Sequence, residues 1–295
     1  MTTTHTIDTT GGRRLSFCQF GEMDGRPVLF CQGTPSSRLM HPSEAITRDL
    51  GARLLVIDRP GFGLTDPQAG RTLLDFAGDA AAVLDHAGID RCAVAAISGG
   101  GPYALAFGHE RSDRVDAIAL AACTGPLDDM RVLAGASWKR RAGYRIARHG
   151  GPAIMELAIR LTDGRETDSA KFLTRYTRHN LGSDQEILAR PEVREMYLRN
   201  FAEAFRQGLR PFAEEVCLAS RPWGFDLAQI RCPVDIWHGT EDTSTPLAMG
   251  RAMADRLTDC MLHILEGQGH LFAYGPLWRD VLSRLLVRAG ERERG

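Results

Sequence analysis

The chain has 295 residues, a length that suits one α/β core enlarged by an insertion. Apolar residues make up 43% and charged residues 25%, and the formal net charge is −1. This balance favours neither nucleic acid nor an anionic membrane as a partner. No secretion signal and no run of about 18 apolar residues is apparent, so we expect a cytoplasmic protein without a membrane span.

The cysteines give no sign of a metal site or of a disulfide framework. They are scattered, odd in number and mostly within apolar runs: Cys18, Cys31, Cys92, Cys123, Cys217, Cys232 and Cys260. No pair of them, and no cluster with histidine, has the spacing of a metal-ligand set. We therefore expect buried free thiols in a reducing compartment, no metal and no cofactor.

Strands and helices alternate through the first part of the chain. Short apolar or alternating runs predict strands at residues 13–20, 27–31, 53–57, 92–96 and 115–122. Leucine, alanine and phenylalanine at helical spacing predict a helix over 73–87, and an Ala- and Leu-rich stretch after Pro102 predicts another. Loops rich in Gly and Pro follow two of the strands, at 32–38 and 58–63.

The middle of the chain has a different pattern. Residues 126–222 show helical runs and no convincing strand. The alternation resumes with a strand at 234–237, a helix near 246–257, a strand at 261–265 and a last helix near 276–288. We expect an α/β fold with a mostly parallel central sheet flanked by helices and an inserted helical cap. The core would comprise 1–124 and 226–295, and the cap 125–225 would cover the carboxyl edge of the sheet, where such sheets bind ligands.

A sharp turn within residues 92–108 singles out Ser98. Small apolar residues before it favour a strand buried on both faces, and three glycines after it let the chain pass at once into a helix. A side chain at the apex of such a turn projects to where a substrate can reach it. Ser98 is therefore a candidate nucleophile, although a serine in this position can also cap a helix or line a phosphate site.

A serine nucleophile needs a base, and the base needs an acid to orient it. Folds with this kind of turn place the acid and then the histidine after the serine in the chain. Among nine histidines, His270 alone combines this order with a strand-end loop and flanking glycines. The acid is Asp242, three residues after Gly239, with the neighbouring Glu241 in reserve.

Acyl transfer also needs hydrogen-bond donors for the oxyanion that develops on the substrate. The backbone N–H of Gly99, next to the nucleophile, is one expected donor. The loop at 32–38 lies before the turn in the chain, and its glycine allows a close approach, so the Thr34 N–H is the second expected donor.

Successive segments of the chain resemble the motifs of capped α/β-hydrolase-fold enzymes, in their serine hydrolase branch. The segments are Gln32-Gly33-Thr34-Pro35, Asp58-Arg59-Pro60-Gly61-Phe62-Gly63, Ile97-Ser98-Gly99-Gly100-Gly101-Pro102, His238-Gly239-Thr240-Glu241-Asp242 and Gly269-His270. The resemblance extends over about 11–124 and 226–290. It implies the α/β-hydrolase fold, and serine rather than aspartate at the turn argues against the epoxide-hydrolase and haloalkane-dehalogenase branches.

Two residues depart from the family pattern. Gln32 stands where the oxyanion loop usually has histidine, and Ala96 stands at the first small position of the G-x-S-x-G motif. Glutamine can still form hydrogen bonds, so Gln32 remains a candidate substrate-binding residue. Arg38, in the same loop, is either structural or a contact for an acyl or acid group.

The expected cap is rich in aromatic residues: Trp138, Tyr144, Tyr176, Tyr197, Phe201, Phe205, Phe212, Trp223 and Phe225. Most would form its core, and some, with Trp223 as a candidate, would contact a partly apolar substrate. Residues 131–148 contain six basic residues and no acid. They indicate a solvated helix face or, alternatively, a site for an anionic substrate or partner.

We therefore expect a serine hydrolase that cleaves a carboxylic ester or related acyl bond through an acyl-enzyme. Perhydrolysis, C–C bond hydrolysis or a lyase step with the same three residues is an alternative, as is a largely non-catalytic ligand-binding protein. The expected partner is a small ester-like molecule, with neither nucleic acid nor membrane, and the chain is either a monomer or a homodimer.

Overall fold

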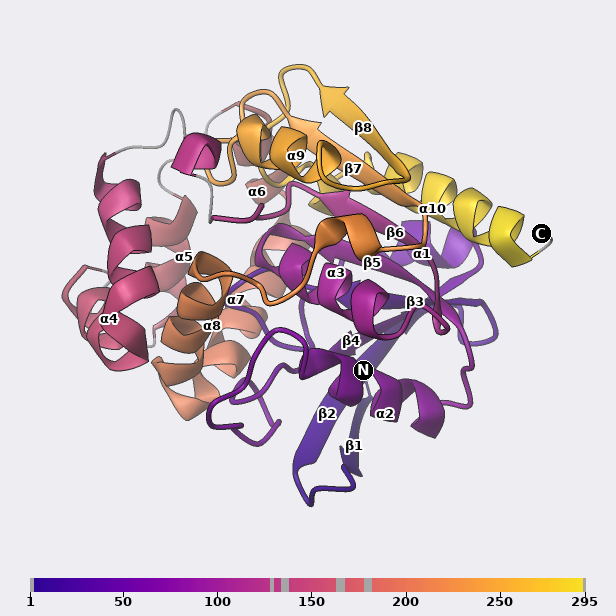
Figure 1. Ribbon diagram of the computed structural model, residues 1–295, viewed down its shortest axis with the longest axis horizontal. Helices are drawn as coiled ribbons and strands as arrows, with labels where there is room; N and C mark the ends of the chain where they lie inside the picture. Colours follow the sequence, from indigo (N-terminus) through magenta and orange to yellow (C-terminus); the bar gives the residue numbers. More distant parts are fainter. Residues whose placement is uncertain (1–2, 128–129, 134–137, 163–167, 178–181, 294–295) are drawn as a thin grey trace.

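The computed structural model describes residues 3–127, 130–133, 138–162, 168–177 and 182–293. Within them, eight strands form one sheet in the order β1-β2-β4-β3-β5-β6-β7-β8, with helices on both faces (Figure 1). The strands are β1 (Thr4–Asp8), β2 (Arg14–Gly21), β3 (Arg26–Cys31), β4 (Ala52–Ile57), β5 (Cys92–Ile97), β6 (Val115–Ala121), β7 (Val234–Gly239) and β8 (Cys260–Leu265).

The sheet is mostly parallel, as the sequence predicts. Strands β2 to β8 correspond to the seven strands that the sequence predicts, and every neighbouring pair from β4 to β8 in the sheet order is parallel. Strand β2 runs antiparallel to β4, and β1 extends the antiparallel edge beside β2. The sequence did not predict β1, because its five residues, Thr-His-Thr-Ile-Asp, contain only one aliphatic side chain and form an edge strand.

Ten α-helices are described, five of them between β6 and β7. They are α1 (Glu44–Asp49), α2 (Phe76–His86), α3 (Gly101–Glu110), α4 (Trp138–Thr162), α5 (Ser169–Thr177), α6 (Ser183–Leu188), α7 (Pro191–Ala204), α8 (Arg210–Ser220), α9 (Leu247–Ala254) and α10 (Trp278–Glu293). Helix α1 was not predicted, since six residues are too few to show a helical period.

Helix α2 begins three residues later than its apolar spacing predicts. The Asp75 carboxylate accepts hydrogen bonds from the backbone N–H of Thr72 at 2.6 Å and from the Thr72 hydroxyl at 2.7 Å. These bonds close a separate turn ahead of the helix. Leu73 is nevertheless buried against the core, which explains why it fits the apolar pattern of the helix.

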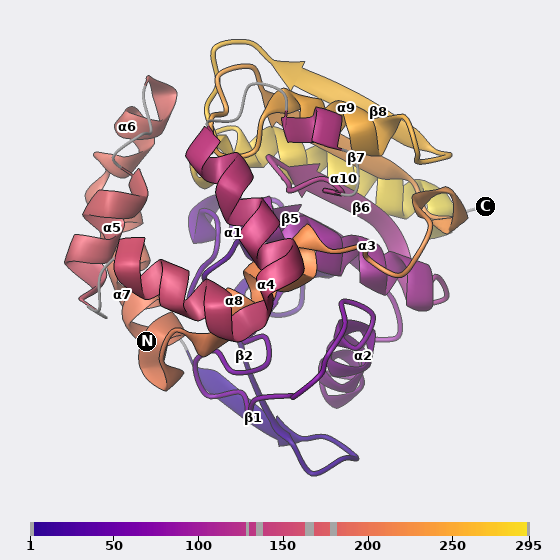
Figure 2. The same cartoon turned by 60° about the vertical axis from the view of Figure 1, so that its left-hand side comes forward.

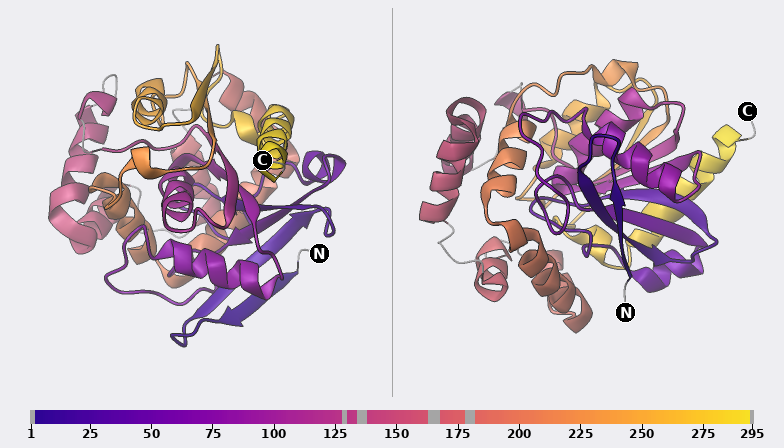
Figure 3. Two further views of the ribbon diagram at one scale, coloured as in Figure 1. Left: turned by 45° about the vertical axis from the view of Figure 1, so that its right-hand side comes forward. Right: turned by 90° about the horizontal axis from the view of Figure 1, so that it is seen from below.

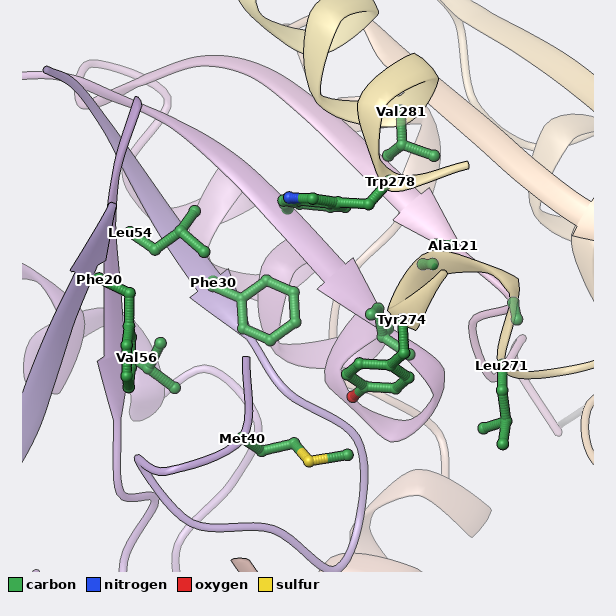
Figure 4. Close-up of a cluster of buried hydrophobic side chains, with 14 of the residues drawn as sticks. Phe20, Phe30, Met40, Leu54, Val56, Ala121, Leu271, Tyr274, Trp278 and Val281 are labelled. Atoms are coloured by element: carbon green, nitrogen blue, oxygen red, sulfur yellow. The ribbon is translucent and has the colours of Figure 1, made fainter. Parts of the chain in front are cut away.

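Neighbouring residues of each central strand belong to two apolar clusters, one on each face of the sheet. Phe30 of β3 packs edge-on against Trp278 of α10, with ring centroids 6.0 Å apart (Figure 4). Leu29, the preceding residue, belongs instead to the cluster that contains Val83 of α2 and Phe107 of α3. The alternation follows from the two-residue period of a strand, and it explains why the parallel strands read as continuous apolar runs.

The helices inserted between β6 and β7 gather on one side of the molecule. Figures 1 and 2 show α4, α5, α7 and α8 grouped together, and the view from below in Figure 3 shows the same group set apart from the C-terminal helix. No strand occurs among the described residues between β6 and β7. Phe172 of α5 and Phe201 of α7 join the same apolar cluster as Phe30 and Trp278, so this insertion shares a core with the sheet.

The structure also bears on the expectations about membrane-spanning helices and cysteines. In the part of the chain that the structure describes, no helix has both the length and the apolar character to cross a bilayer. The seven cysteines are free, and all except Cys260 are buried.

In the basic segment, residues 131–148, Arg141 and Arg145 are exposed, and Arg148 donates a hydrogen bond to the Leu127 carbonyl at 3.1 Å. The side chains of Arg131, Lys139 and Arg140 lie outside the described part.

Candidate active site

The turn between β5 and α3 has the backbone geometry that its sequence predicts. Ser98 has a φ of 55°, a left-handed conformation that is uncommon for any residue other than glycine. A Cβ added at Gly100 would lie 2.0 Å from the Cys31 carbonyl oxygen, so only glycine lets the start of the helix cross β3 this closely. The side chain of Ser98 is half-buried at the carboxyl end of the central strands.

Three loops that follow different strands bring Ser98, His270 and Asp242 together. The Ser98 Oγ lies 3.0 Å from His270 Nε2, and His270 Nδ1 lies 2.8 Å from Asp242 Oδ2. The loops follow β5, β8 and β7, whose carboxyl ends point the same way because the strands are parallel. Glu241, the alternative acid, is exposed, whereas Asp242 is buried.

The Asp242 carboxylate is held in its ionised form. Burial by itself would raise the pKa of Asp242, but the charge and hydrogen bond of His270, together with the nearby His238 and backbone N–H groups, lower it overall. Asp242 Oδ1 accepts hydrogen bonds from the N–H groups of Ser244 and Thr245, both at 2.8 Å. An ionised carboxylate cannot donate, so His270 carries its proton on Nδ1 and leaves Nε2 to accept from Ser98.

A second histidine holds the loop that carries Asp242. His238 is fully buried at the end of β7, and its Nε2 lies 2.6 Å from the Thr245 carbonyl oxygen. Burial lowers the pKa of His238, although the nearby Asp242 raises it in part. A neutral ring that donates to this carbonyl fixes the loop that carries Asp242.

The two expected oxyanion donors lie side by side next to Ser98. A Cβ added at Gly99 would lie 3.2 Å from the Thr34 backbone nitrogen, and one added at Gly33 would lie 3.2 Å from the Ser98 Cβ. Thr34 and Gly99 line the same cavity as Ser98 and His270. The glycines therefore let the loop after β3 approach Ser98 closely.

A buried ion pair that sequence reasoning missed anchors this loop. Arg59, in the loop after β4, donates to the Gln32 carbonyl at 2.6 Å and to the Gly33 carbonyl at 2.7 Å. The same guanidinium pairs with Glu215 of α8, whose carboxylate also accepts a 2.7 Å hydrogen bond from the Thr34 hydroxyl. Burial would raise the pKa of Glu215, but the charge and hydrogen bonds of Arg59, together with the charge of Arg71 and the hydrogen bond from Thr34, lower it overall.

A carboxylate from the insertion also holds the histidine loop. Asp184 of α6 is buried, and it accepts hydrogen bonds from the backbone N–H of His270 at 2.9 Å and of Leu271 at 2.7 Å. Ser183 accepts a further bond from the Gly269 N–H at 2.9 Å. No pattern in the sequence pointed to Asp184, because it lies 86 residues before His270.

Three candidate substrate-binding residues do not line the cavities at Ser98. The Gln32 side chain donates to the Ile57 carbonyl at 2.7 Å and is buried. Arg38 pairs with Asp58 and Glu203, both at 2.7 Å, so its charge is already compensated. Buried partners within the protein occupy both side chains, which for Arg38 is the structural alternative that the sequence left open.

The third, Trp223, borders a different cavity. Its indole N–H donates to the Ala219 carbonyl at 3.2 Å. The ring lines a separate cavity of about 560 Å³ with Arg221 and Phe225, and Ser98 is not among the described residues of that cavity. Helix α8 ends at Ser220, three residues before Trp223.

Two cavities meet at Ser98 and His270. The smaller, about 10 Å³, is walled by aromatic and aliphatic side chains that include Tyr197 and Phe201 of α7. The larger, about 250 Å³, is lined by Tyr144 of α4 and by Phe212 of α8 together with the polar residues around Ser98. Aromatic side chains of the insertion thus line both cavities, and Trp223 is not one of them. Within the described residues, no cluster of three or more His, Cys, Asp or Glu side chains could hold a metal ion.

Comparison with curated proteins gives relatives at low identity. The chain is 25% identical over 255 residues to the AB hydrolase superfamily protein YisY of Bacillus subtilis, covering 83% of this chain and 85% of that one. It is 29% identical over 112 residues to the uncharacterized hydrolase YcgS of the same organism, and 30% identical over 101 residues to haloalkane dehalogenase 2 of Mycobacterium bovis. These last two matches span 39% and 35% of the relatives' lengths.

Solved structures of similar fold cover nearly the whole chain. A thermophilic esterase from Thermogutta terrifontis superposes with a TM-score of 0.62 at 25% identity, covering 97% of this chain and 98% of that one. The epoxide hydrolase CorEH superposes with a TM-score of 0.71 at 18% identity, covering 99% and 100%. A family model described as the alpha/beta hydrolase fold matches residues 26–275. The chain therefore belongs to the alpha/beta hydrolase fold family.

Proposed function

We propose that the protein is a serine esterase that cleaves a carboxylic ester of a small, partly apolar molecule. One observation carries the proposal: the unbroken line of hydrogen-bonded groups from Ser98 through His270 to Asp242. Its chemistry is that of a hydroxyl nucleophile with a base and an orienting acid. The similarity to a solved esterase over nearly the whole chain supports the same reaction class.

In the first half of the reaction, the Ser98 Oγ attacks the carbonyl carbon of the ester. The Ser98 proton passes to His270 Nε2, and the ionised Asp242 stabilises the positive charge on the ring. The carbonyl oxygen becomes an oxyanion, to which the Gly99 and Thr34 N–H groups donate. When the tetrahedral intermediate collapses, the bond to the alkoxy group breaks, and that group leaves with the proton from His270.

In the second half, water attacks the acyl group on Ser98, and His270 again takes and returns the proton.

The nucleophile also decides between the reaction classes found among the relatives. Attack by a serine hydroxyl on an alkyl halide or an epoxide carbon would leave an ether bond between Ser98 and the substrate. Water at neutral pH does not cleave such a bond. Attack on an acyl carbon leaves an ester, which the same base can hydrolyse. Ser98 therefore favours acyl transfer.

We also propose that residues 125–225 act as a cap on a core formed by 1–124 and 226–295. Tyr144, Phe212 and Glu215 belong to this insertion and line the cavity that contains Ser98. A roof of this kind removes water from the site and sets which substrates fit. The proposed partner is accordingly a small ester, bound between the sheet and the inserted helices.

The experiment that tests the esterase proposal is the Ser98→Ala variant. We expect it to lose hydrolysis of p-nitrophenyl acetate and of methyl butyrate, and to lose labelling by a fluorophosphonate probe, because no other group supplies the nucleophile. Alanine tolerates the same backbone geometry as serine, so thermal melting should be nearly unchanged. Ser112→Ala, in the turn after α3, is the matched control and should retain both signals. Hydrolysis by Ser98→Ala at the wild-type rate would refute the assignment.

A further inference from the structure

The two cavities at Ser98 differ greatly in size, and this difference bears on which esters fit. Both are bordered by Thr34, Ser98 and His270, so both open onto the atoms proposed to react. An ester carbonyl bonded to Ser98 has two arms, the acyl chain and the alkoxy group, and each must enter a cavity. About 250 Å³ is available on one side and about 10 Å³ on the other.

The small cavity has room for little more than one methyl-sized group. A volume of about 10 Å³ corresponds to a single water-sized sphere. Its apolar walls are Met40, Ile97, Tyr197, Phe201, Leu271 and Tyr274. All six are at most 5% exposed, and a wall buried in a close-packed core does not yield to a longer chain without repacking.

One of these side chains also borders a far larger space. Tyr274 lines a groove of about 810 Å³ on the outer side, formed with residues of α1 and α7 that include Ile46, Val193 and Met196. In Figure 4 the Tyr274 ring stands near Met40 and Leu271, two other walls of the small cavity. Tyr274 packs edge-on against Tyr197, with ring centroids 5.6 Å apart, which holds the ring in this position.

We propose that the site selects esters with one short arm, and that Tyr274 is the specificity-determining residue that limits it. The Tyr274 ring closes the small cavity where it would otherwise join the outer groove. The long arm of the substrate then occupies the 250 Å³ cavity beside Tyr144 and Phe212. This inference rests on the proposed esterase function, which it deepens by naming the shape of the substrate.

The test uses three esters: methyl hexanoate, in which the acyl chain is long, hexyl acetate, in which the alkoxy group is long, and hexyl hexanoate, in which both are long. Hydrolysis of each is followed by titration of the released acid. We expect wild type to hydrolyse one of the first two, and to hydrolyse hexyl hexanoate with a kcat/KM about 100-fold lower, because several methylenes find no room. Whichever one-armed ester is preferred identifies the arm that enters the small cavity. Equal kcat/KM for hexyl hexanoate and the preferred ester would overturn the inference.

The decisive variant is Tyr274→Ala, which removes the ring between the small cavity and the groove. We expect the kcat/KM ratio of hexyl hexanoate to the preferred ester to rise about 10-fold or more. Tyr274→Phe keeps the ring and should keep the wild-type ratio. Because truncating a buried ring can unfold the protein, Met40→Ala provides a second test: it enlarges the cavity without opening it, so it should improve only esters whose short arm has two or three carbons.

Failure of this inference and failure of the esterase proposal give different results. A folded Tyr274→Ala variant that hydrolyses the preferred ester with an unchanged ratio would refute the role of Tyr274 and leave the esterase proposal standing. No hydrolysis of any of the three esters by wild type, together with no fluorophosphonate labelling of Ser98, would refute both.

Discussion

At the level of single residues, the orientation of His270 depends on a carboxylate that takes no part in the proposed reaction. Asp184 accepts the backbone N–H groups of His270 and Leu271, and a Cβ added at Gly269 would lie 2.5 Å from the same carboxylate. Glycine at 269 therefore allows the close approach, and Asp184 fixes the loop from the side of the insertion. Asp184 is a positioning residue, because it acts on His270 through the backbone alone.

We predict that Asp184→Ala lowers kcat far more than it changes KM. The substitution leaves two buried N–H groups without an acceptor, at a cost of about 1–3 kcal/mol each. A shift of the loop by about 1 Å would lower the rate roughly 100-fold. Asp184→Asn keeps one acceptor oxygen and should have an intermediate rate. Steady-state kinetics and the rate of fluorophosphonate labelling would measure the effect, and a folded Asp184→Ala variant with wild-type kcat would contradict it.

At the level of elements, α8 is joined to the loops after β3 and β4 by the Arg59–Glu215 pair. Both side chains are only 1% exposed, and the guanidinium also donates to two carbonyl groups of the loop that carries Thr34. Removing one partner of a buried pair leaves the other charge uncompensated, which is far more destabilising than the loss of a surface pair. The pair therefore fastens the insertion to the oxyanion loop.

We predict that Glu215→Ala lowers the free energy of unfolding by about 3–5 kcal/mol. The matched control is Glu214→Gln on the same helix, whose carboxylate pairs with Arg210 at the surface at 3.0 Å. That exposed pair should contribute no more than about 0.5 kcal/mol. Urea unfolding of both variants would measure the difference, and equal stabilities would show that the buried pair does not fasten the two parts together.

The same pair predicts a pH dependence of stability. Despite burial, Arg59 lowers the pKa of Glu215 below its ordinary value of 4.5, so the folded protein releases this proton more readily than the unfolded chain. The stability it contributes is complete above the ordinary value and is lost as the pH falls through the lowered one. The difference in unfolding free energy between wild type and Glu215→Gln should therefore be constant near neutral pH and shrink below about pH 4.5. A difference that grows towards acid pH would contradict this sign.

At the level of the whole molecule, the insertion and the sheet share one apolar core. Phe172 and Phe201 of the inserted helices belong to the same cluster as Phe30 of the sheet and Trp278 of α10. The ion pair of Glu215 and the hydrogen bonds of Asp184 join the two parts at further points. With so many contacts across the boundary, the described inserted helices pack into the apolar cluster on one face of the sheet rather than around an interior of their own.

We predict that the whole chain unfolds in a single transition. Far-ultraviolet circular dichroism, which reports mainly on helices, should have the same urea midpoint as tryptophan fluorescence, to which the buried Trp278 contributes. Loss of ester hydrolysis should follow the same curve, since residues of both parts line the cavity at Ser98, the proposed nucleophile. Two separate transitions would show that the inserted helices unfold on their own.

The sequence by itself determined the order of the elements and the residues at their ends. Runs such as 92–96 and 234–237 predict buried strands because apolar side chains are needed on both faces, and Ser98, Asp242 and His270 lie in loops after predicted strands. Parallel strands bring their carboxyl ends to one edge, so three distant loops could be placed together without coordinates. The edge strand β1 and the short helix α1 escaped prediction, because too few apolar residues mark them.

Only the tertiary structure decided which side chains surround these loops. Asp184 reaches His270 across 86 positions, and Glu215 reaches Arg59 across 156, so no local pattern records either contact. Gln32 and Arg38 have polar groups that a substrate could have used, but buried partners occupy them instead. Periodicity and turn chemistry act over a few residues, whereas the packing of the insertion onto the sheet decides which side chains border Ser98 and how much space they leave.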